Sequence, residues 1–261
     1  MIRISHLSLI LILVVFLFAC APVDKQHYLL DEPVTWHIHE ATDKNTYAYL
    51  NLENEQFGEA SYTWSQPSTE QPPQDFGNIN YLVEENSFDT QADGFMRARF
   101  FGQTEDGSLI LYGFRTKGGT YWIKNTEDNT YGINYLPTSI VSDEDTTNVD
   151  GIIIHCKDLV CNNNAGNIGL IISYEGIATQ STPLAVFEAY NILVNGSLNI
   201  FTPDKNITIN NYFERHSIYP PLGAVRRVLY LRELENAIDV EMKLSNTNID
   251  TSSFTKDLTI E

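Results

Sequence analysis

The chain has 261 residues, of which 43% are hydrophobic and 11% aromatic, and its formal net charge is −18 at pH 7. This length and this apolar content are enough for one domain with a sizeable core. The excess of acidic residues repels nucleic-acid phosphates and anionic lipid headgroups, so we expect no nucleic-acid partner.

An export signal is the first predicted element in chain order, over residues 1–19. Arg3 carries its positive charge, and an almost continuous apolar run follows from Leu7 to Phe18. The run is shorter than the roughly 20 apolar residues that a membrane-spanning helix needs, and its length is typical of a secretory signal. We therefore expect this segment to be removed from the mature protein.

The signal ends in Leu17-Phe18-Ala19-Cys20, which resembles the lipobox of bacterial lipoproteins. The resemblance implies cleavage before Cys20, a diacylglycerol on its thiol and a further acyl chain, such as palmitate, on the new amine. Two or more acyl chains anchor a protein stably, because each buried CH₂ contributes roughly 0.8 kcal/mol. By the same resemblance, Ala21 in place of an Asp favours the outer membrane. Residues 20–33 would then be the lipidated cysteine and its tether, and residues 34–261 a single domain.

The mature sequence is rich in Tyr, Phe, Thr, Ile and Val, and Gly, Asn and Asp interrupt it at short intervals, which predicts strands separated by turns. The clearest hairpin joins Gly94–Gly102 to Ser108–Thr116, because Asp106-Gly107 is a strong turn signal. Residues 224–240 would suit a strand or a helix, so a few short helices are also expected. Further strands are predicted at Thr35–Glu40, Ala48–Leu52, Ser61–Ser65, Asn78–Glu84, Thr120–Lys124, Gly151–Cys156, Ile168–Glu175, Leu184–Val194, Tyr212–Tyr219, Val225–Arg232 and Val240–Ser245.

Two motifs in the second half resemble those of periplasmic lipoproteins. Thr182-Pro183 leads into an alternating strand that contains Phe187, and Tyr219-Pro220-Pro221-Leu222-Gly223 ends an aromatic-rich strand. The resemblance covers roughly residues 95–245 and implies a long antiparallel sheet curled into an open half-barrel, similar to the periplasmic carriers of lipoproteins. The predicted fold is therefore all-β and antiparallel, with a β-sandwich as the alternative.

Cys156 and Cys161 are the cysteines that remain beside Cys20. Two nearby cysteines in an exported protein typically form a disulfide, and so short a loop gains roughly 2 kcal/mol from it. A metal site made by these two cysteines and His155 is the alternative interpretation.

His37-Ile38-His39 would place both imidazoles on one face of the predicted strand, because strand side chains alternate with period two. That spacing suits a zinc ion if a third ligand, such as Glu40 or His155, arrives from elsewhere. A pair of exposed strand histidines without a metal is the favoured interpretation. Likewise, the acidic loop from Asp143 to Asp150 is interpreted as solvated, since it lacks the pattern of a calcium-binding loop.

The sequence contains no nucleophile elbow, phosphate-binding glycine loop or dinucleotide fingerprint. We therefore expect a non-enzymatic module without a cofactor, anchored to the outer membrane through Cys20, that binds or carries a hydrophobic ligand or an envelope component. Two alternatives stay open. One is a structural or adhesive lipoprotein that contacts envelope proteins through its loops, and the other is a metal-dependent envelope hydrolase that uses His37 and His39.

Overall fold

The computed structural model divides the chain into two compact units, Met1–Glu32 and Pro33–Glu261. The described residues all belong to the second unit, so the predicted signal, Cys20 and the tether lie outside them, as does part of the acidic loop. The residues that the structure describes are 34–50, 56–67, 72–77, 79–88, 98–116, 119–141, 146–157, 160–201, 206–230 and 239–250.

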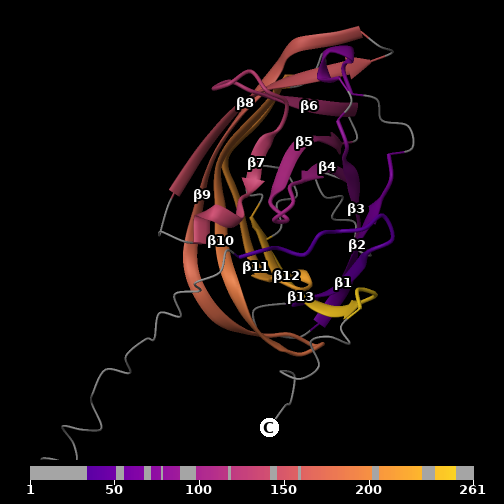
Figure 1. The fold of residues 1–261 in the computed structure, drawn as a ribbon, viewed down its shortest axis with the longest axis vertical. Coiled ribbons are helices and arrows are strands. Elements are labelled where there is room, and N and C mark those ends of the chain that lie inside the picture. Colours follow the sequence, from indigo (N-terminus) through magenta and orange to yellow (C-terminus); the bar gives the residue numbers. More distant parts are fainter. Residues whose placement is uncertain are drawn as a thin grey trace, which may run out of the picture. The chain divides into compact units, whose positions relative to one another are not determined.

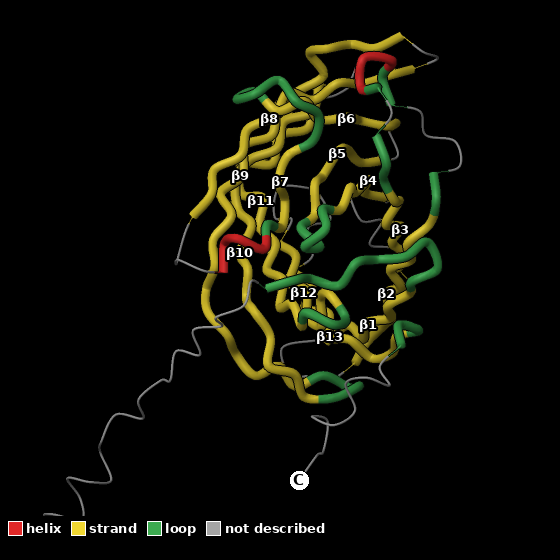
Figure 2. Tube along the Cα trace, in the orientation of Figure 1, coloured by secondary structure: helices red, strands yellow, loops and turns green. Residues whose placement is uncertain are grey.

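Strands dominate the described residues, with two short 3₁₀ helices and no α-helix among them (Figures 1 and 2). In this part of the chain, no helix has the length and the apolar character to span a membrane. The elements are β1 (Lys44–Leu50), β2 (Gln56–Ser65), η1 (Gln74–Phe76), β3 (Leu82–Phe88), β4 (Ala98–Gln103), β5 (Leu109–Thr116), β6 (Gly119–Asn125), β7 (Ile133–Leu136), η2 (Thr138–Val141), β8 (Thr146–Lys157), β9 (Val160–Ser181), β10 (Val186–Phe201), β11 (Asn206–Tyr219), β12 (Gly223–Tyr230) and β13 (Asp239–Thr247).

These strands form one antiparallel sheet that closes on itself. Each strand pairs with the next along the chain, except that β6 pairs with β8 while β7 pairs with β5 beside it. β4 also pairs with β5, and β13 returns to pair with β1, so the strands other than β7 form a closed barrel of twelve. Figure 1 shows the ring that they make.

Closure corrects the predicted fold class. The all-β, antiparallel prediction is right, but the open half-barrel and the β-sandwich are both wrong. The resemblance behind the half-barrel covered only roughly residues 95–245, whereas β1, β2 and β3 lie before that range and complete the ring. The last strand, β13, pairs with β1, which lies about 200 residues earlier in the chain, and Asn45 is opposite Thr247 in this pair.

The predicted hairpin around Gly107 is confirmed as the pair β4 and β5. Gly107 has φ +82°, a backbone conformation that glycine adopts readily. The register between β8 and β9 also places Cys156 directly opposite Cys161. The side chain of Cys156 lies outside the described residues, so the disulfide stays a prediction.

The segment that precedes β1 departs from the prediction. Residues 34–40 have no regular secondary structure, and the first strand starts at Lys44 rather than at Thr35. The segment lies against the turn between β4 and β5, where the Trp36 amide donates a hydrogen bond to the Asp106 carbonyl at 2.9 Å. Contacts with that turn, and not a strand ladder, therefore fix the position of this segment.

Candidate functional site

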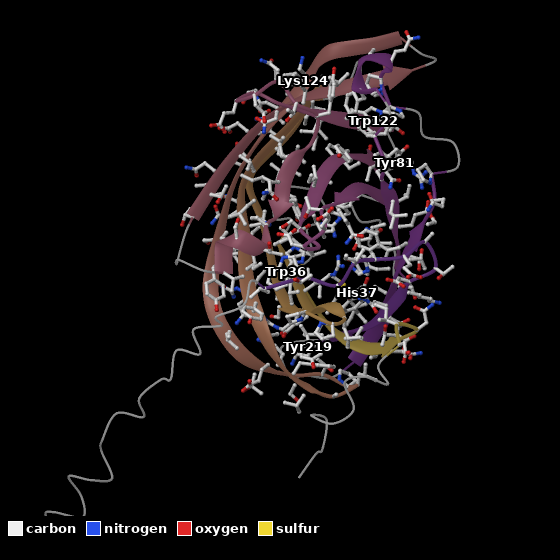
Figure 3. The ribbon with its side chains drawn as sticks, viewed as in Figure 1. Trp36, His37, Tyr81, Trp122, Lys124 and Tyr219 are labelled. Atoms are coloured by element: carbon white, nitrogen blue, oxygen red, sulfur yellow. The ribbon has the colours of Figure 1, made fainter. Side chains whose placement is uncertain are left out.

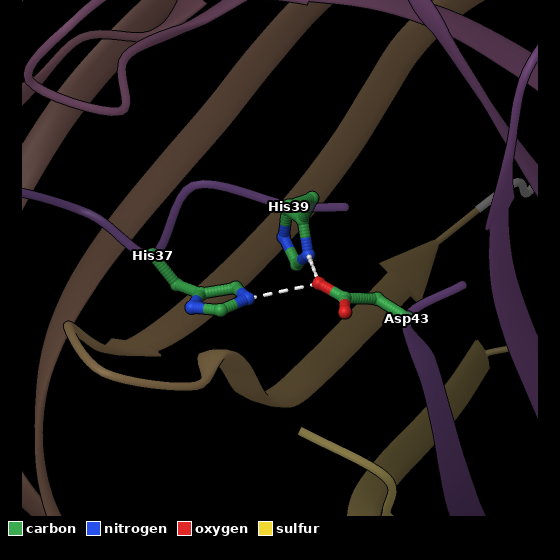
Figure 4. Close-up of side chains that lie close together, drawn as sticks. All are labelled: His37, His39 and Asp43. Carbon is green, nitrogen blue, oxygen red and sulfur yellow. Dashed lines mark hydrogen bonds and ion pairs between the residues drawn. The ribbon is translucent and has the colours of Figure 1, made fainter. Parts of the chain in front are cut away.

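The two histidines of the His37-Ile38-His39 motif meet at one carboxylate, that of Asp43 (Figure 4). The Nε2 atom of His37 lies 2.8 Å from Asp43 Oδ2, and the Nδ1 atom of His39 lies 3.1 Å from the same oxygen. The two imidazole rings are perpendicular, with centroids 4.8 Å apart. Each of the three residues offers one possible ligand atom, and these atoms all lie within 4.8 Å of one another. We call this group the His–Asp cluster.

A tight turn brings Asp43 back to the histidines. The Asp43 amide donates to the Glu40 carbonyl at 3.0 Å, and the Glu40 amide donates to Asp43 Oδ2 at 3.1 Å. The Asp43 carbonyl accepts from the Trp64 amide at 2.9 Å, which joins the turn to β2. Glu40, the predicted third ligand, thus contributes its backbone to the cluster, and the carboxylate comes from Asp43 instead.

His39 occupies a closely fitted position. Its ring stacks on the indole of Trp64, with centroids 4.0 Å apart and an interplanar angle of 9°. A Cβ atom at Gly223 would lie 3.2 Å from the His39 ring, and Gly223 has φ +77°, so a side chain there would be both strained and crowded. His39 is only 8% exposed, which contradicts the prediction of an exposed pair of strand histidines.

Electrostatics keep the buried members of the cluster in their metal-binding protonation states. Burial raises the pKa of Asp43, but the hydrogen bonds from the two histidines and the Glu40 amide outweigh it and hold this pKa well below its ordinary value. Burial lowers the pKa of His39, and the bond to Asp43 opposes this shift without reversing it. At neutral pH the carboxyl group is ionised and the His39 imidazole is neutral, and binding of an ion at Nδ1 would move the proton that this atom donates to Asp43 to the other ring nitrogen.

The other predicted ligand, His155, lies elsewhere. It belongs to β8, stacks on Tyr121 at 4.8 Å, and is not a member of the His–Asp cluster. Asp150, at the end of the acidic loop, offers its backbone carbonyl to the Thr126 amide at 3.0 Å. No metal-ligand cluster besides the His–Asp cluster occurs among the described residues.

A second polar group, which the sequence did not reveal, crosses the barrel interior. Arg99 donates to Glu84 Oε2 through Nε at 2.9 Å and Nη2 at 2.7 Å, and to Glu214 Oε2 through Nη1 at 3.0 Å. Arg227 donates to Glu84 Oε1 at 2.7 Å, and His216 Nε2 lies 2.9 Å from Glu214 Oε2. We call these five residues the interior charge network. It ties β3 and β4 to β11 and β12.

A small cavity lies between the two groups. It has a volume of about 30 Å³, which is space for roughly two water molecules. Its lining includes His37 and His39 of the His–Asp cluster and Glu84, Arg99 and Arg227 of the interior charge network. The two groups therefore line a common space.

Because Trp36 contacts the turn, we expect the change Gly107→Ala to lower the free energy of unfolding strongly. A Cβ atom at Gly107 would lie 2.3 Å from the Trp36 carbonyl oxygen, so the added methyl must displace the segment that carries His37. Gly176→Ala is the matched control, because Gly176 also has positive φ but nothing within 4 Å. Left-handed strain costs about 1–2 kcal/mol in both variants, and the clash adds about 1–3 kcal/mol in Gly107→Ala alone. Urea unfolding measures the difference, and equal losses would contradict the contact.

Comparison with known proteins gives only remote likenesses. No protein-family model matches the chain, and no curated protein matches it. A Bacteroides fragilis protein predicted to be exported, with a YmcC-like fold, is similar at 13% identity and a TM-score of 0.42, over 82% of this chain and 99% of that one. A predicted lipoprotein from Parabacteroides distasonis is similar at 14% identity and a TM-score of 0.38, over 83% of this chain and 100% of that one. Likenesses of this level carry no functional argument, so export and the lipid on Cys20 stay predictions.

Proposed function

We propose that the protein is a lipid-anchored protein of the bacterial envelope whose barrel domain binds one divalent transition-metal ion, zinc first among them, through His37, His39 and Asp43. The observation that carries the proposal is the gathering of two imidazole nitrogens and one carboxylate oxygen within 4.8 Å. These are ligand types of zinc sites, and three protein ligands leave a fourth position open. The net charge of −18 also attracts cations to the protein.

Two of the three distances in the cluster are close to those that an ion requires. A tetrahedral zinc ion with bonds of about 2.0–2.1 Å holds its ligand atoms roughly 3.4 Å apart. The Asp43 oxygen is 2.8 and 3.1 Å from the two histidine nitrogens, so these two separations must grow slightly. The three ligand atoms span up to 4.8 Å, so the widest separation must shrink by more than about 1 Å when an ion binds. The stacking of Trp64 on His39 orients one ligand before any ion arrives.

We propose a non-enzymatic role for this site. The cavity beside His37 and His39 has space for roughly two water molecules, which is too little for a peptide or an acyl chain. At the His–Asp cluster, this size favours the binding of an ion over the hydrolysis of a bulky substrate.

Zinc titration of the purified protein, stripped with EDTA, tests the proposal by calorimetry and by metal analysis after dialysis. We expect one zinc ion per chain in the wild type. His37→Ala and Asp43→Asn should each weaken zinc binding by about 100-fold or more, since losing even an outer partner of a ligand costs about 10–100-fold.

His155→Ala is the matched control, because His155 lies outside the His–Asp cluster. It should bind zinc as the wild type does. A wild type that retains no stoichiometric zinc, or a His37→Ala variant that binds as tightly as the wild type, would overturn the proposal and leave the cluster as a hydrogen-bonded support for the segment before β1.

A further inference from the structure

Hydrogen-bond donors without an acceptor gather around the cavity. The indole Nε1 atoms of Trp36 and Trp64 and the Nε and Nη1 atoms of Arg227 are buried, and none has a hydrogen-bond partner within the part of the chain that the structure describes. The three residues are 4%, 2% and 5% exposed, and all three line the cavity. Figure 3 labels Trp36 and His37, which lie within the ring of strands in that view.

The chemistry of these groups selects a ligand that accepts hydrogen bonds. An indole N–H and a guanidinium N–H can only donate, so four such unpaired atoms on three residues that line one space call for an acceptor with several lone pairs. Buried polar groups in native proteins are almost always paired, which makes four unpaired donors at one cavity a strong signal.

Charges of both signs surround the cavity. Arg99, Arg227 and Glu84 line it, and Glu214, 3.0 Å from Arg99, and Asp43, 2.8 Å from His37, lie directly behind that lining. The two guanidinium groups therefore offset carboxylates rather than exceed them, and the unpaired donors, not the net charge, select the ligand. At about 30 Å³, the space admits only a very small molecule or ion.

We infer that this cavity binds a small monovalent anion, of the size of chloride or formate, through the indole N–H groups of Trp36 and Trp64 and the guanidinium of Arg227. The anion site goes beyond the proposed metal site, because its groups donate protons and are not metal ligands. The anion site needs no metal ion, so the inference also holds if the His–Asp cluster binds none.

Thermal unfolding of the full chain in EDTA, with sodium chloride replacing sodium gluconate at constant ionic strength, tests the inference. Gluconate is too bulky for the cavity, so it serves as the non-binding anion. A ligand that binds only the native state raises the midpoint in proportion to ln(1 + [L]/Kd). We expect the wild-type midpoint to rise with chloride along a single-site curve, and formate to give the same behaviour.

Trp64→Phe and Trp36→Phe each remove one N–H group and keep an aromatic ring. Each should raise the apparent Kd for chloride by about tenfold or more, as expected for a hydrogen bond to a charged group. Trp122→Phe is the matched control, because Trp122 Nε1 is also buried without a partner among the described residues but does not line the cavity. Figure 3 shows Trp122 well away from Trp36.

Two results would overturn the inference. One is a wild-type midpoint that does not depend on chloride or formate, which would mean that water alone occupies the cavity. The other is an equal response from Trp64→Phe, Trp36→Phe and Trp122→Phe, which would place the anion elsewhere. Asp43→Asn, run in the same series, separates the two sites, because Asp43 is not in the cavity lining: it should weaken zinc binding by about 100-fold or more while chloride still stabilises the protein.

Discussion

Arg99→Met is expected to destabilise the protein by about 3–5 kcal/mol, or to prevent folding altogether. Arg99 is 5% exposed and pairs with Glu84 and Glu214, which are 2% and 6% exposed. Removal of the guanidinium leaves Glu214 with no other arginine partner in the network, and Glu84 with Arg227 alone. An uncompensated buried charge is costly because the interior replaces its hydration poorly. Urea unfolding measures the loss.

Arg215→Met is the matched control on the outside of the barrel. Arg215 makes the same kind of two-bond pair, with Glu175, at 2.6 and 3.0 Å, but both side chains are about one-third exposed. Exposed pairs of this kind contribute about 0–1 kcal/mol, so this variant should unfold almost as the wild type does.

A compensating variant separates charge from packing. If the loss in Arg99→Met comes from the unpaired charge of Glu214, adding Glu214→Gln should recover part of it, because a neutral amide costs less to bury and Glu84 keeps its pair with Arg227. A loss below about 1 kcal/mol in Arg99→Met, or no recovery in the double variant, would contradict the role of the network in holding opposite strands together.

Local features of the fold could be predicted from the sequence, and the reason is physical. The pair β4 and β5 depends on an alternating pattern and on Gly107 with positive φ, and both are properties of adjacent residues. Most of the other strands follow from β-branched and aromatic runs between turns. Closure of the barrel depends instead on Asn45 meeting Thr247, and no local pattern specifies a pairing over that distance.

The polar groups were predictable only in part. His37 and His39 were recognised as a pair. Asp43 was missed because a strand was expected at Thr35–Glu40, and an extended strand does not allow the turn that brings Asp43 back to the histidines. Asp43 follows His39 by four residues. The sequence Ala41-Thr42-Asp43, which lies between the histidines and β1, was the available turn signal. The interior charge network had no comparable signal, since Arg99 alternates with apolar neighbours as an exposed strand arginine would. Only the ring of strands brings it to Glu214.

Acidification from pH 7 to pH 5 is expected to lower the free energy of unfolding of the metal-free protein. Burial lowers the pKa of His39 and of His216, and the bonds to Asp43 and Glu214 do not reverse either shift. Below the ordinary histidine pKa of about 6.5, the unfolded chain therefore binds protons that the native protein does not. Each histidine contributes a slope of up to about 1.4 kcal/mol per pH unit, until the pH reaches its native pKa.

The carboxylates act in a lower pH window, which keeps the two effects apart. The pKa of Glu84 is raised by burial but lowered further by Arg227 and Arg99, to about 2. Its stabilising contribution is present above the ordinary glutamate pKa and is lost only as the pH falls toward 2. Between about pH 6.5 and 4.5, a fall in stability thus reports on the buried histidines.

Urea unfolding at constant chloride, from pH 7.5 to pH 5, measures how the free energy of unfolding changes with pH. Variants of the two histidines show how much of this slope comes from each. His216→Gln should remove the part that comes from the charge network, because an amide can still donate to Glu214 but does not titrate. His39→Gln should remove the part that comes from the His–Asp cluster, and the double variant should remove both. A double variant that keeps the wild-type slope would show that neither histidine is held neutral inside the barrel. Loss of the slope in the double variant would show that His39 in the His–Asp cluster and His216 in the interior charge network are both held uncharged by the fold.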